Sequence, residues 1–143
     1  MPKKKYLLDT CAVLAFLNDE KGADIVCELF DQAKLGEIEI GMSAANIIEV
    51  YYDRIRVVGS EKADKTIQKI YETFPVSIIE TLTPDIIYEA AYFKSSGKMS
   101  FVDSILIATA KCNEMIVVTC DHVELKPVEQ QGQITFLWIR PQF

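Results

Sequence analysis

The chain has 143 residues, of which half are hydrophobic and a quarter are charged, with a formal net charge of −6. This length suits one domain with a substantial core, and we treat residues 1–143 as a single domain. The acidic balance argues against a protein that holds nucleic acid non-specifically through a basic face. It leaves nucleic acid open as a substrate, because acids gathered in a metal site count toward the same total.

Cysteine spacing and hydropathy indicate the cellular compartment of the protein. The four cysteines show no C-x-x-C spacing, which disfavours a zinc site and fits reduced thiols in a cytosolic protein. The apolar stretch after the N-terminal lysines is too short for a signal peptide, and no apolar run approaches the length of a membrane span. We therefore expect a cytoplasmic protein that does not bind membranes.

Short apolar runs alternate with helical patterns in the first half of the chain. Strands are expected at residues 6–8, 38–42 and 74–79, and helices at 11–17, at 22–34, between Ser43 and Gly59, and from Ser60 onward. Ser43 and Ser60 stand at N-cap positions, and Gly36 and Gly59 follow helices as C-terminal glycines do. The helix after Ser43 carries apolar side chains at helical spacing, namely Ile48, Tyr51, Tyr52 and Ile55.

The second half is organised around residues 99–121, which read as helix, short loop, strand and then an acid. Ser100 has Asp103 three residues later, which is the capping-box spacing, and the helix that follows is apolar almost all round and therefore buried. The run 115–118 suits a strand of a parallel sheet covered on both faces. The remaining elements are a helix from Thr83-Pro84 to about Ser96, a polar and mobile loop at 123–133, and an edge strand at 134–139. This alternation predicts an α/β fold with helices on both faces of a parallel sheet.

Four acids follow strands or open the helices next to them. Asp9 and Asp121 come after apolar strands, Asp103 opens the helix that leads into the second of these strands, and Glu49 lies in the second turn after Ser43. The carboxyl ends of parallel strands share one edge, so the four acids can converge on one cleft. Two carboxylates 4 Å apart repel by about 4 kcal/mol at an effective dielectric near 20, so such a cluster needs protons or a cation. An all-oxygen ligand set suits Mg²⁺ or Mn²⁺.

Each acid also has a purely structural interpretation. Asp103 could only complete a capping box, and Asp9 and Asp121 could cap whatever follows them. Glu49 could belong to a solvated helix face shared with Asn46, Asp53 and Arg56. The joint placement of the four acids favours the metal site over these separate explanations.

Other chemistries find little support in the sequence. There is no phosphate-binding glycine loop, and Asp9-Thr10-Cys11 lacks the second acid of a D-x-D phosphatase or a receiver domain. His122, the only histidine, is expected to be a solvated loop residue, and Cys11 and Cys120 to be small buried thiols. The candidates for phosphate contacts, each also explicable as ordinary surface charge, are Arg54, Lys94, Lys98 and Lys111.

At four places the sequence resembles the PIN-domain nucleases, especially the VapC-like toxins of toxin–antitoxin pairs. These places are residues 7–14 (LLDTCAVL), 43–49, 102–110 and 116–121 (IVVTCD). The resemblance implies a three-layer α/β/α sandwich with a parallel sheet of about five strands. Two departures affect residues beside the acids: Cys11 stands where the family commonly has Ser or Asn, and Cys120 where Asn is frequent.

The function implied by this resemblance is that of a metal-dependent endoribonuclease. The acids of the family match Asp9, Glu49, Asp103 and Asp121, which would hold Mg²⁺ or Mn²⁺. Implied partners are an RNA substrate, an antitoxin protein and a second copy of the chain. Two alternatives remain open: an inactive PIN-like domain that binds RNA or protein, and a phosphoryl-transfer or receiver-type protein.

Overall fold

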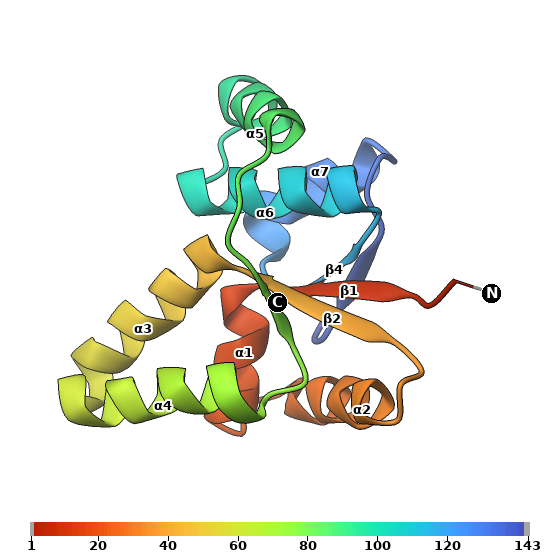
Figure 1. Cartoon of the computed structure of the whole chain (residues 1–143). Coiled ribbons are helices and arrows are strands. Elements are labelled where there is room, and N and C mark those ends of the chain that lie inside the picture. The colour runs from red at the N-terminus through yellow and green to blue at the C-terminus, as the bar shows by residue number, and fades with distance from the viewer. Residues whose placement is uncertain (1, 142–143) are drawn as a thin grey trace.

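Five parallel strands form the sheet at the centre of the molecule (Figure 1). The structure is a computed structural model that describes residues 2–141. The strands are β1 (Lys5–Leu8), β2 (Glu39–Ser43), β3 (Ser77–Ile79), β4 (Ile116–Thr119) and β5 (Phe136–Trp138). Their order is β3-β2-β1-β4-β5, with Leu8 of the central strand paired to Val118 of its neighbour β4. The predicted five-stranded parallel sheet is confirmed, with β5 at an edge.

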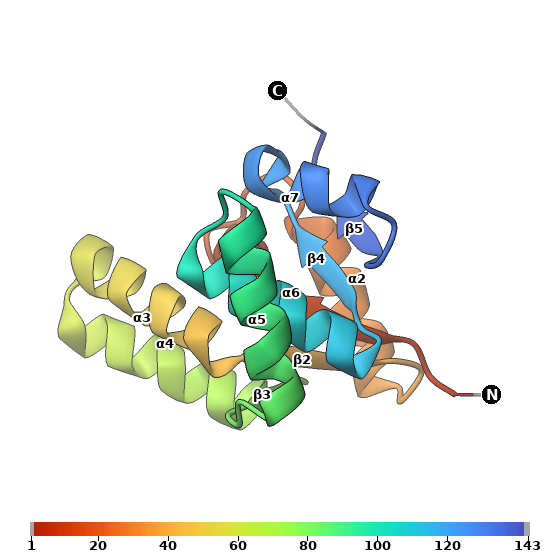
Figure 2. The same cartoon turned by 90° about the horizontal axis from the view of Figure 1, so that it is seen from above.

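Helices cover both faces of this sheet (Figures 1 and 2). They are α1 (Thr10–Leu17), α2 (Ala23–Lys34), α3 (Ala44–Val58), α4 (Ser60–Thr73), α5 (Pro84–Ser96), α6 (Phe101–Asn113) and α7 (His122–Gln130). The first four lie on one side of the sheet and the last three on the other. The predicted three-layer α/β/α sandwich is therefore confirmed.

The hydrophobic core has two parts, one on each face of the sheet. Successive side chains of a strand point to opposite faces, so Leu8 and Val118 pack with α1 to α4, whereas Leu7 and Val117 pack with α5 to α7. Burial on both faces explains why β1 and β4 are continuously apolar in sequence. The helix α6 is buried over most of its circumference, as its sequence predicts.

The polar segment 123–133 contradicts its prediction as a mobile loop, because most of it forms α7. Leu125 and Val128 of this helix are buried against the second part of the core. Polar composition and Pro127, which removes one backbone donor inside the helix, hide the helical pattern in the sequence. The buried pair of apolar side chains holds the helix in place in spite of that proline.

Two details of the neighbouring helices α3 and α4 also differ from expectation. Ser43 caps α3 by accepting a hydrogen bond from the Ala45 N–H at 3.2 Å, as predicted. Ser60 is not an N-cap: Gly59, in a left-handed conformation with φ of 86°, precedes α4 without any side-chain cap. The apolar row on α3 does not face the core either, since its members Ile48, Tyr52 and Ile55 are exposed and the buried apolar side chains are Ile47 and Val50.

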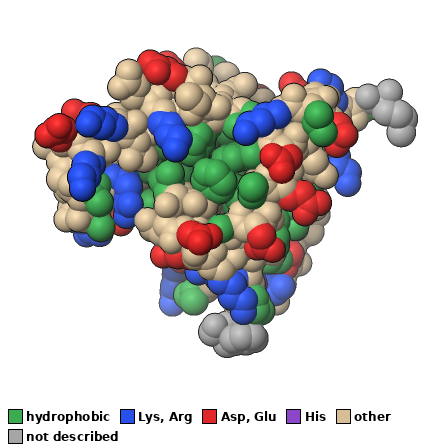
Figure 3. Space-filling model, turned by 90° about the horizontal axis from the view of Figure 1, so that it is seen from below, with side chains coloured by type: hydrophobic (Ala, Val, Ile, Leu, Met, Phe, Trp, Pro, Cys, Tyr) green, Lys and Arg blue, Asp and Glu red, His purple; other side chains and the backbone are tan. Residues whose placement is uncertain are grey.

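Charged side chains of both signs are mixed over the face of the molecule seen in Figure 3, with hydrophobic side chains in the hollow between them. This face has no continuous basic surface, in keeping with the net charge of −6. Within residues 2–141, no helix is long and apolar enough to cross a membrane.

Candidate metal centre

A cavity of about 320 Å³ opens at the carboxyl edge of the sheet, and all four predicted acids line it. Its lining residues are Asp9, Thr10, Cys11, Leu14, Glu49, Ser100, Asp103, Asp121 and Glu124. The acids come from the end of β1, from α3, from the first turn of α6 and from the end of β4. The parallel sheet thus brings together Asp9 and Asp121, which lie 112 residues apart in the sequence.

Asp9 is the most tightly held of these acids. It is the N-cap of α1 and only 4% exposed. Its Oδ1 accepts hydrogen bonds from the Thr10 N–H at 2.8 Å and from Asn46 Nδ2 at 3.2 Å, and its Oδ2 accepts one from Thr119 Oγ1 at 2.7 Å. Burial raises the pKa of Asp9 to about 6 in spite of these donors. Asp9 is therefore a preorganised carboxylate with little freedom to turn.

Asn46 links Asp9 to Glu49 on the same side of the cavity. It is completely buried, and its Nδ2 donates to Asp9 Oδ1 and also to Thr10 Oγ1 at 3.0 Å. The Thr10 hydroxyl in turn donates to Glu49 Oε1 at 2.6 Å. The alternative that placed Asn46 on a solvated face of α3 is wrong, because its amide orients the acids instead.

We expect Thr119→Val to weaken Mn²⁺ binding by about 10- to 100-fold, because the hydroxyl that orients Asp9 is lost while the shape of the side chain is kept. The same hydroxyl accepts the Asp121 N–H at 3.1 Å, so two acids lose a fixed partner. Isothermal titration measures the Mn²⁺ affinity of Thr119→Val and of the control Thr119→Ser, which keeps the hydroxyl. Equal affinities for Val and Ser at this position would contradict the assigned role.

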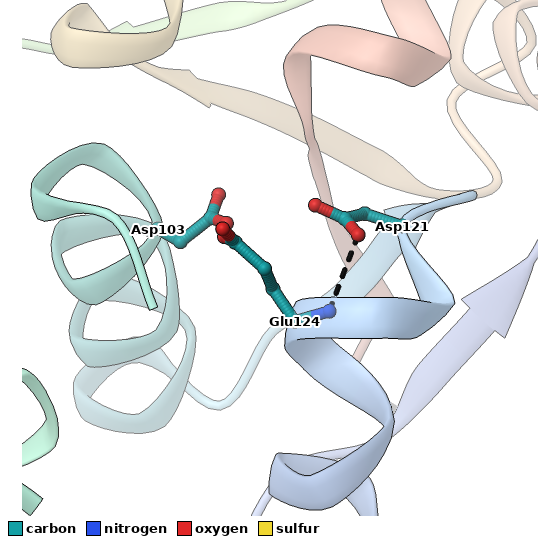
Figure 4. A group of neighbouring side chains, drawn as sticks. All are labelled: Asp103, Asp121 and Glu124. Carbon is teal, nitrogen blue, oxygen red and sulfur yellow. Dashed lines mark hydrogen bonds between the residues drawn. The ribbon is translucent and has the colours of Figure 1, made fainter. Parts of the chain in front are cut away.

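The carboxylates of Asp103, Asp121 and Glu124 form the tightest acidic group, with one oxygen from each lying within 4.8 Å of the others. In Figure 4 the side chains of Asp103 and Glu124 point toward each other from α6 and α7. Asp121 is the N-cap of α7 and accepts the Glu124 N–H at 3.3 Å. All three residues of the group line the cavity.

The capping box predicted at Ser100 is only half formed by Asp103. Ser100 Oγ accepts the Asp103 N–H at 3.1 Å, as expected. The reciprocal bond from the Ser100 N–H goes to Glu124 Oε2 at 3.4 Å. The carboxylate of Asp103 is thereby left to the cavity, which argues against a purely capping role for it.

The electrostatics of this group show its need for positive charge. Burial, followed by the hydrogen bond with Glu124 and the negative charges of Asp9, Glu124 and Asp121, raises the pKa of Asp103 to about 9. The same hydrogen bond lowers the pKa of Glu124. Without a cation, these surroundings favour the protonated form of Asp103 beside an ionised Glu124. A divalent cation can replace that proton, and the all-oxygen donor set fits Mg²⁺ or Mn²⁺.

Glu124 is the site residue that sequence reasoning missed. Its segment was predicted to be a loop, so the sequence did not indicate where the side chain of Glu124 would point. The signal was present as Asp121-x-x-Glu124, the spacing of an N-cap and its N3 partner. Among the described residues, the group with oxygens within 4.8 Å includes Glu124 but neither Asp9 nor Glu49.

His122 and three of the four candidate cations, Arg54, Lys94 and Lys111, have partners within the protein. The His122 ring stacks on Trp138 with centroids 4.1 Å apart, and its Nε2 lies 2.9 Å from the Arg140 carbonyl oxygen, so the expected solvated loop histidine is wrong. Lys94 donates to the Met99 carbonyl, Lys111 pairs with Glu89, and Arg54 bonds with Asn18 and Asp53. Their contact with phosphate stays a prediction.

Two cysteines adjoin the acids. The Cys120 N–H donates to Cys11 Sγ at 3.1 Å, and Cys11 Sγ donates to Asp9 Oδ2 over 3.8 Å. Arg140 donates to Cys120 Sγ at 3.0 Å. The hydrogen bond between the two thiols, together with Arg140, lowers the pKa of Cys120 to about 7 and raises the pKa of Cys11. All four cysteines of the chain are free, as predicted.

Comparisons with known proteins agree with this geometry. The sequence matches the PIN domain family over residues 6–127. A comparison with curated proteins finds no match. Among solved structures, DNA-bound VapBC from Salmonella typhimurium is 14% identical, with a TM-score of 0.70 over 96% of this chain and 99% of the other. VapBC-1 from nontypeable Haemophilus influenzae is 16% identical, with a TM-score of 0.70 over 94% and 98%.

A third similar structure has a description that states what it cleaves. It is VapC20 from Mycobacterium tuberculosis, described as a toxin that cleaves the sarcin–ricin loop, and it is 16% identical. Its TM-score is 0.66 over 90% of this chain and 96% of the other. At these identities the structural likeness establishes a shared fold.

Proposed function

Because this chain belongs to the PIN-domain family, we propose that it is an endoribonuclease that depends on Mg²⁺ or Mn²⁺ and hydrolyses phosphodiester bonds. The observation that carries the proposal is the cavity lined by Asp9, Glu49, Asp103, Asp121 and Glu124, whose clustered carboxylates need a cation. One of the similar structures is described as a toxin that cleaves the sarcin–ricin loop, and this description supports RNA as the substrate in our proposal.

The residues of the cavity would have different roles in such a reaction. Asp103, Asp121 and Glu124 would hold the principal ion, and Asp9 and Glu49 would complete its surroundings directly or through water. The bound ion would supply the Lewis acidity that activates water and stabilises charge on the phosphodiester. Asn46 and Thr119 fix the direction of Asp9, so its carboxylate needs no reorganisation when the ion and the substrate arrive.

We expect selective rather than general cleavage of RNA. The chain is acidic, so affinity must come from a few local cations and from the metal's hold on the phosphate, with a shallow salt dependence that corresponds to about two to four phosphate contacts. Structured RNA with an exposed single-stranded loop is the expected substrate, because unstacked bases can be read there.

The test is incubation with total cellular RNA followed by sequencing of the new 5′ ends. Discrete ends should need Mg²⁺ or Mn²⁺, stop in chelator, and disappear in Asp9→Asn and Asp103→Asn. Asp31→Asn, on the exposed part of α2, is the matched control and should cleave normally. Ends that persist in chelator would indicate a contaminating nuclease. A folded protein that yields no ends at any metal concentration would favour the alternative, an inactive domain that binds RNA or protein.

An antitoxin partner belongs to the same proposal. Several of the similar structures are described as toxin–antitoxin complexes, some of them bound to DNA. Expression of the chain alone should then arrest growth, and co-expression of a small neighbouring gene for a DNA-binding protein should restore it. Arrest that is equally strong with Asp103→Asn would show that the effect does not come from the acidic site.

A further inference from the structure

Cys11 and Cys120 meet because they follow neighbouring parallel strands. Cys11 lies in the first turn of α1 after β1, and Cys120 lies between β4 and α7, while Leu8 and Val118 at the ends of these strands are in register. The Cys120 N–H donates to the sulfur of Cys11 at 3.1 Å. The fold thus holds two thiols from distant segments side by side.

The two sulfurs differ in their surroundings. Arg140 donates from its guanidinium to Cys120 Sγ at 3.0 Å. Cys11 instead donates toward Asp9 Oδ2 and lies 3.5 Å from Thr119 Oγ1. Polar contacts therefore hold both sulfurs in place, one beside the other.

Small molecules can reach this pair from the side of Cys11. Both cysteines are only half-buried. Cys11 lines the acidic cavity and also an adjoining cavity of about 400 Å³, which Arg54 and Arg140 line as well. A hydroperoxide is small enough to enter either space. The thiol pair accordingly lies between the core and the two cavities, with Cys11 on the cavity side.

We propose that Cys11 and Cys120 are a redox-active thiol pair, which a hydroperoxide converts into a disulfide that weakens divalent-cation binding in the acidic cavity. The Cys11 sulfur, which lines both cavities, attacks one peroxide oxygen, the O–O bond breaks, and water or an alcohol leaves with the Cys11 proton, so that a sulfenic acid forms on Cys11. Cys120 then attacks that sulfur, the S–O bond breaks, and the hydroxyl leaves as water with the Cys120 proton. The two thiols are oxidised by two electrons, and the peroxide is reduced by two.

The disulfide changes the support of two acids. Asp9 lies two residues before Cys11, and Asp121 directly follows Cys120. Disulfide formation consumes the S–H that donates toward Asp9 Oδ2 and ties the end of β1 to the end of β4. Loss of such an orienting partner typically weakens metal binding by about 10- to 100-fold. This second half of the inference rests on the proposed metal site.

The first experiment uses full-length protein with Cys27→Ser and Cys112→Ser, which leaves only the proposed pair. After treatment with hydrogen peroxide, we expect both thiols to be lost, peptide mapping without reductant to identify one Cys11–Cys120 linkage, and dithiothreitol to restore the thiols. Cys11→Ser in the same background should form no intramolecular linkage. Two free thiols after treatment, or separate sulfinic acids on both cysteines, would overturn the proposal.

The second experiment measures Mn²⁺ affinity by titration of the reduced and the disulfide forms. We expect the disulfide form to bind about tenfold more weakly or worse, and dithiothreitol to restore the affinity. Equal affinities would overturn the proposed control of the site. Failure of the reduced protein to bind Mn²⁺ would overturn the metal site and any control of it, whereas the peptide map would still decide whether the thiol pair is redox-active.

Discussion

Mn²⁺ should raise the melting temperature of the wild-type protein, and Asp9→Asn and Glu124→Gln should each remove most of this effect. A ligand at about 100 times its dissociation constant stabilises the native state by about 2.7 kcal/mol, which for a domain of this size is about 5–10 °C. Asp9 lies at the β1 end of the cavity, and Glu124 lies in the group of oxygens within 4.8 Å. The loss in both variants would place one ion between the two sides of the cavity.

The measurement is thermal unfolding with increasing Mn²⁺, monitored by circular dichroism. Asp31→Asn removes one exposed carboxylate from α2 and should respond like the wild type. If Asp9→Asn loses the response and Glu124→Gln keeps it, Glu124 is a partner of Ser100 and not a ligand. If the wild type and all three variants respond equally, the cavity is not the metal centre.

In the absence of metal, Asp103→Asn should raise the free energy of unfolding at pH 8 by about 1–4 kcal/mol. Burial and neighbouring acids raise the pKa of Asp103 to about 9, so the native protein must hold a proton there that the unfolded chain would release. Asparagine is neutral, has the same shape, and can donate to Glu124 without that cost. Chemical denaturation in chelator measures the difference.

The dependence on pH follows from the same carboxylates. The pKa values of Asp9, about 6, and Asp103, about 9, exceed the ordinary value of 3.8 for an aspartate. At pH values between 3.8 and these raised values, the native state therefore binds more protons than the unfolded state. The free energy of unfolding without metal should therefore fall as pH rises from about 4 to about 9, and less steeply in Asp103→Asn. Stabilisation by Mn²⁺ should grow over the same range, because the ion competes with these protons.

The structural alternative for Asp103 predicts the opposite sign. If its carboxylate were needed as a cap, Asp103→Asn would lose about 0.5–2 kcal/mol. Ser100→Ala is the matched control, since it removes the hydroxyl that accepts the Asp103 N–H and should cost about 1 kcal/mol at every pH. A loss for Asp103→Asn that matches Ser100→Ala and does not vary with pH would show that Asp103 is structural.

Local sequence determined most of the architecture of this protein. Apolar runs such as residues 115–118 can be predicted as strands because they are buried on both faces. Ser43 can be predicted as an N-cap because its hydrogen bond goes to Ala45, two residues later. The alternation of strands and helices requires a parallel sheet, and a parallel sheet brings residues that follow its strands to one edge. Asp9 and Asp121 could therefore be placed near each other from the sequence alone.

Only the tertiary structure decided which side chains complete the site. Asn46 resembles a solvated polar residue in sequence, yet its side chain is buried because Asp9 and Thr10, more than 30 residues away, accept its hydrogen bonds. The side chain of Glu124 is oriented because Leu125 and Val128 of α7 pack into the second part of the core. The polar sequence of this helix gave no indication of that packing. A continuous apolar run indicates the burial of its own strand, whereas the partner of a buried polar group is set by packing between distant segments.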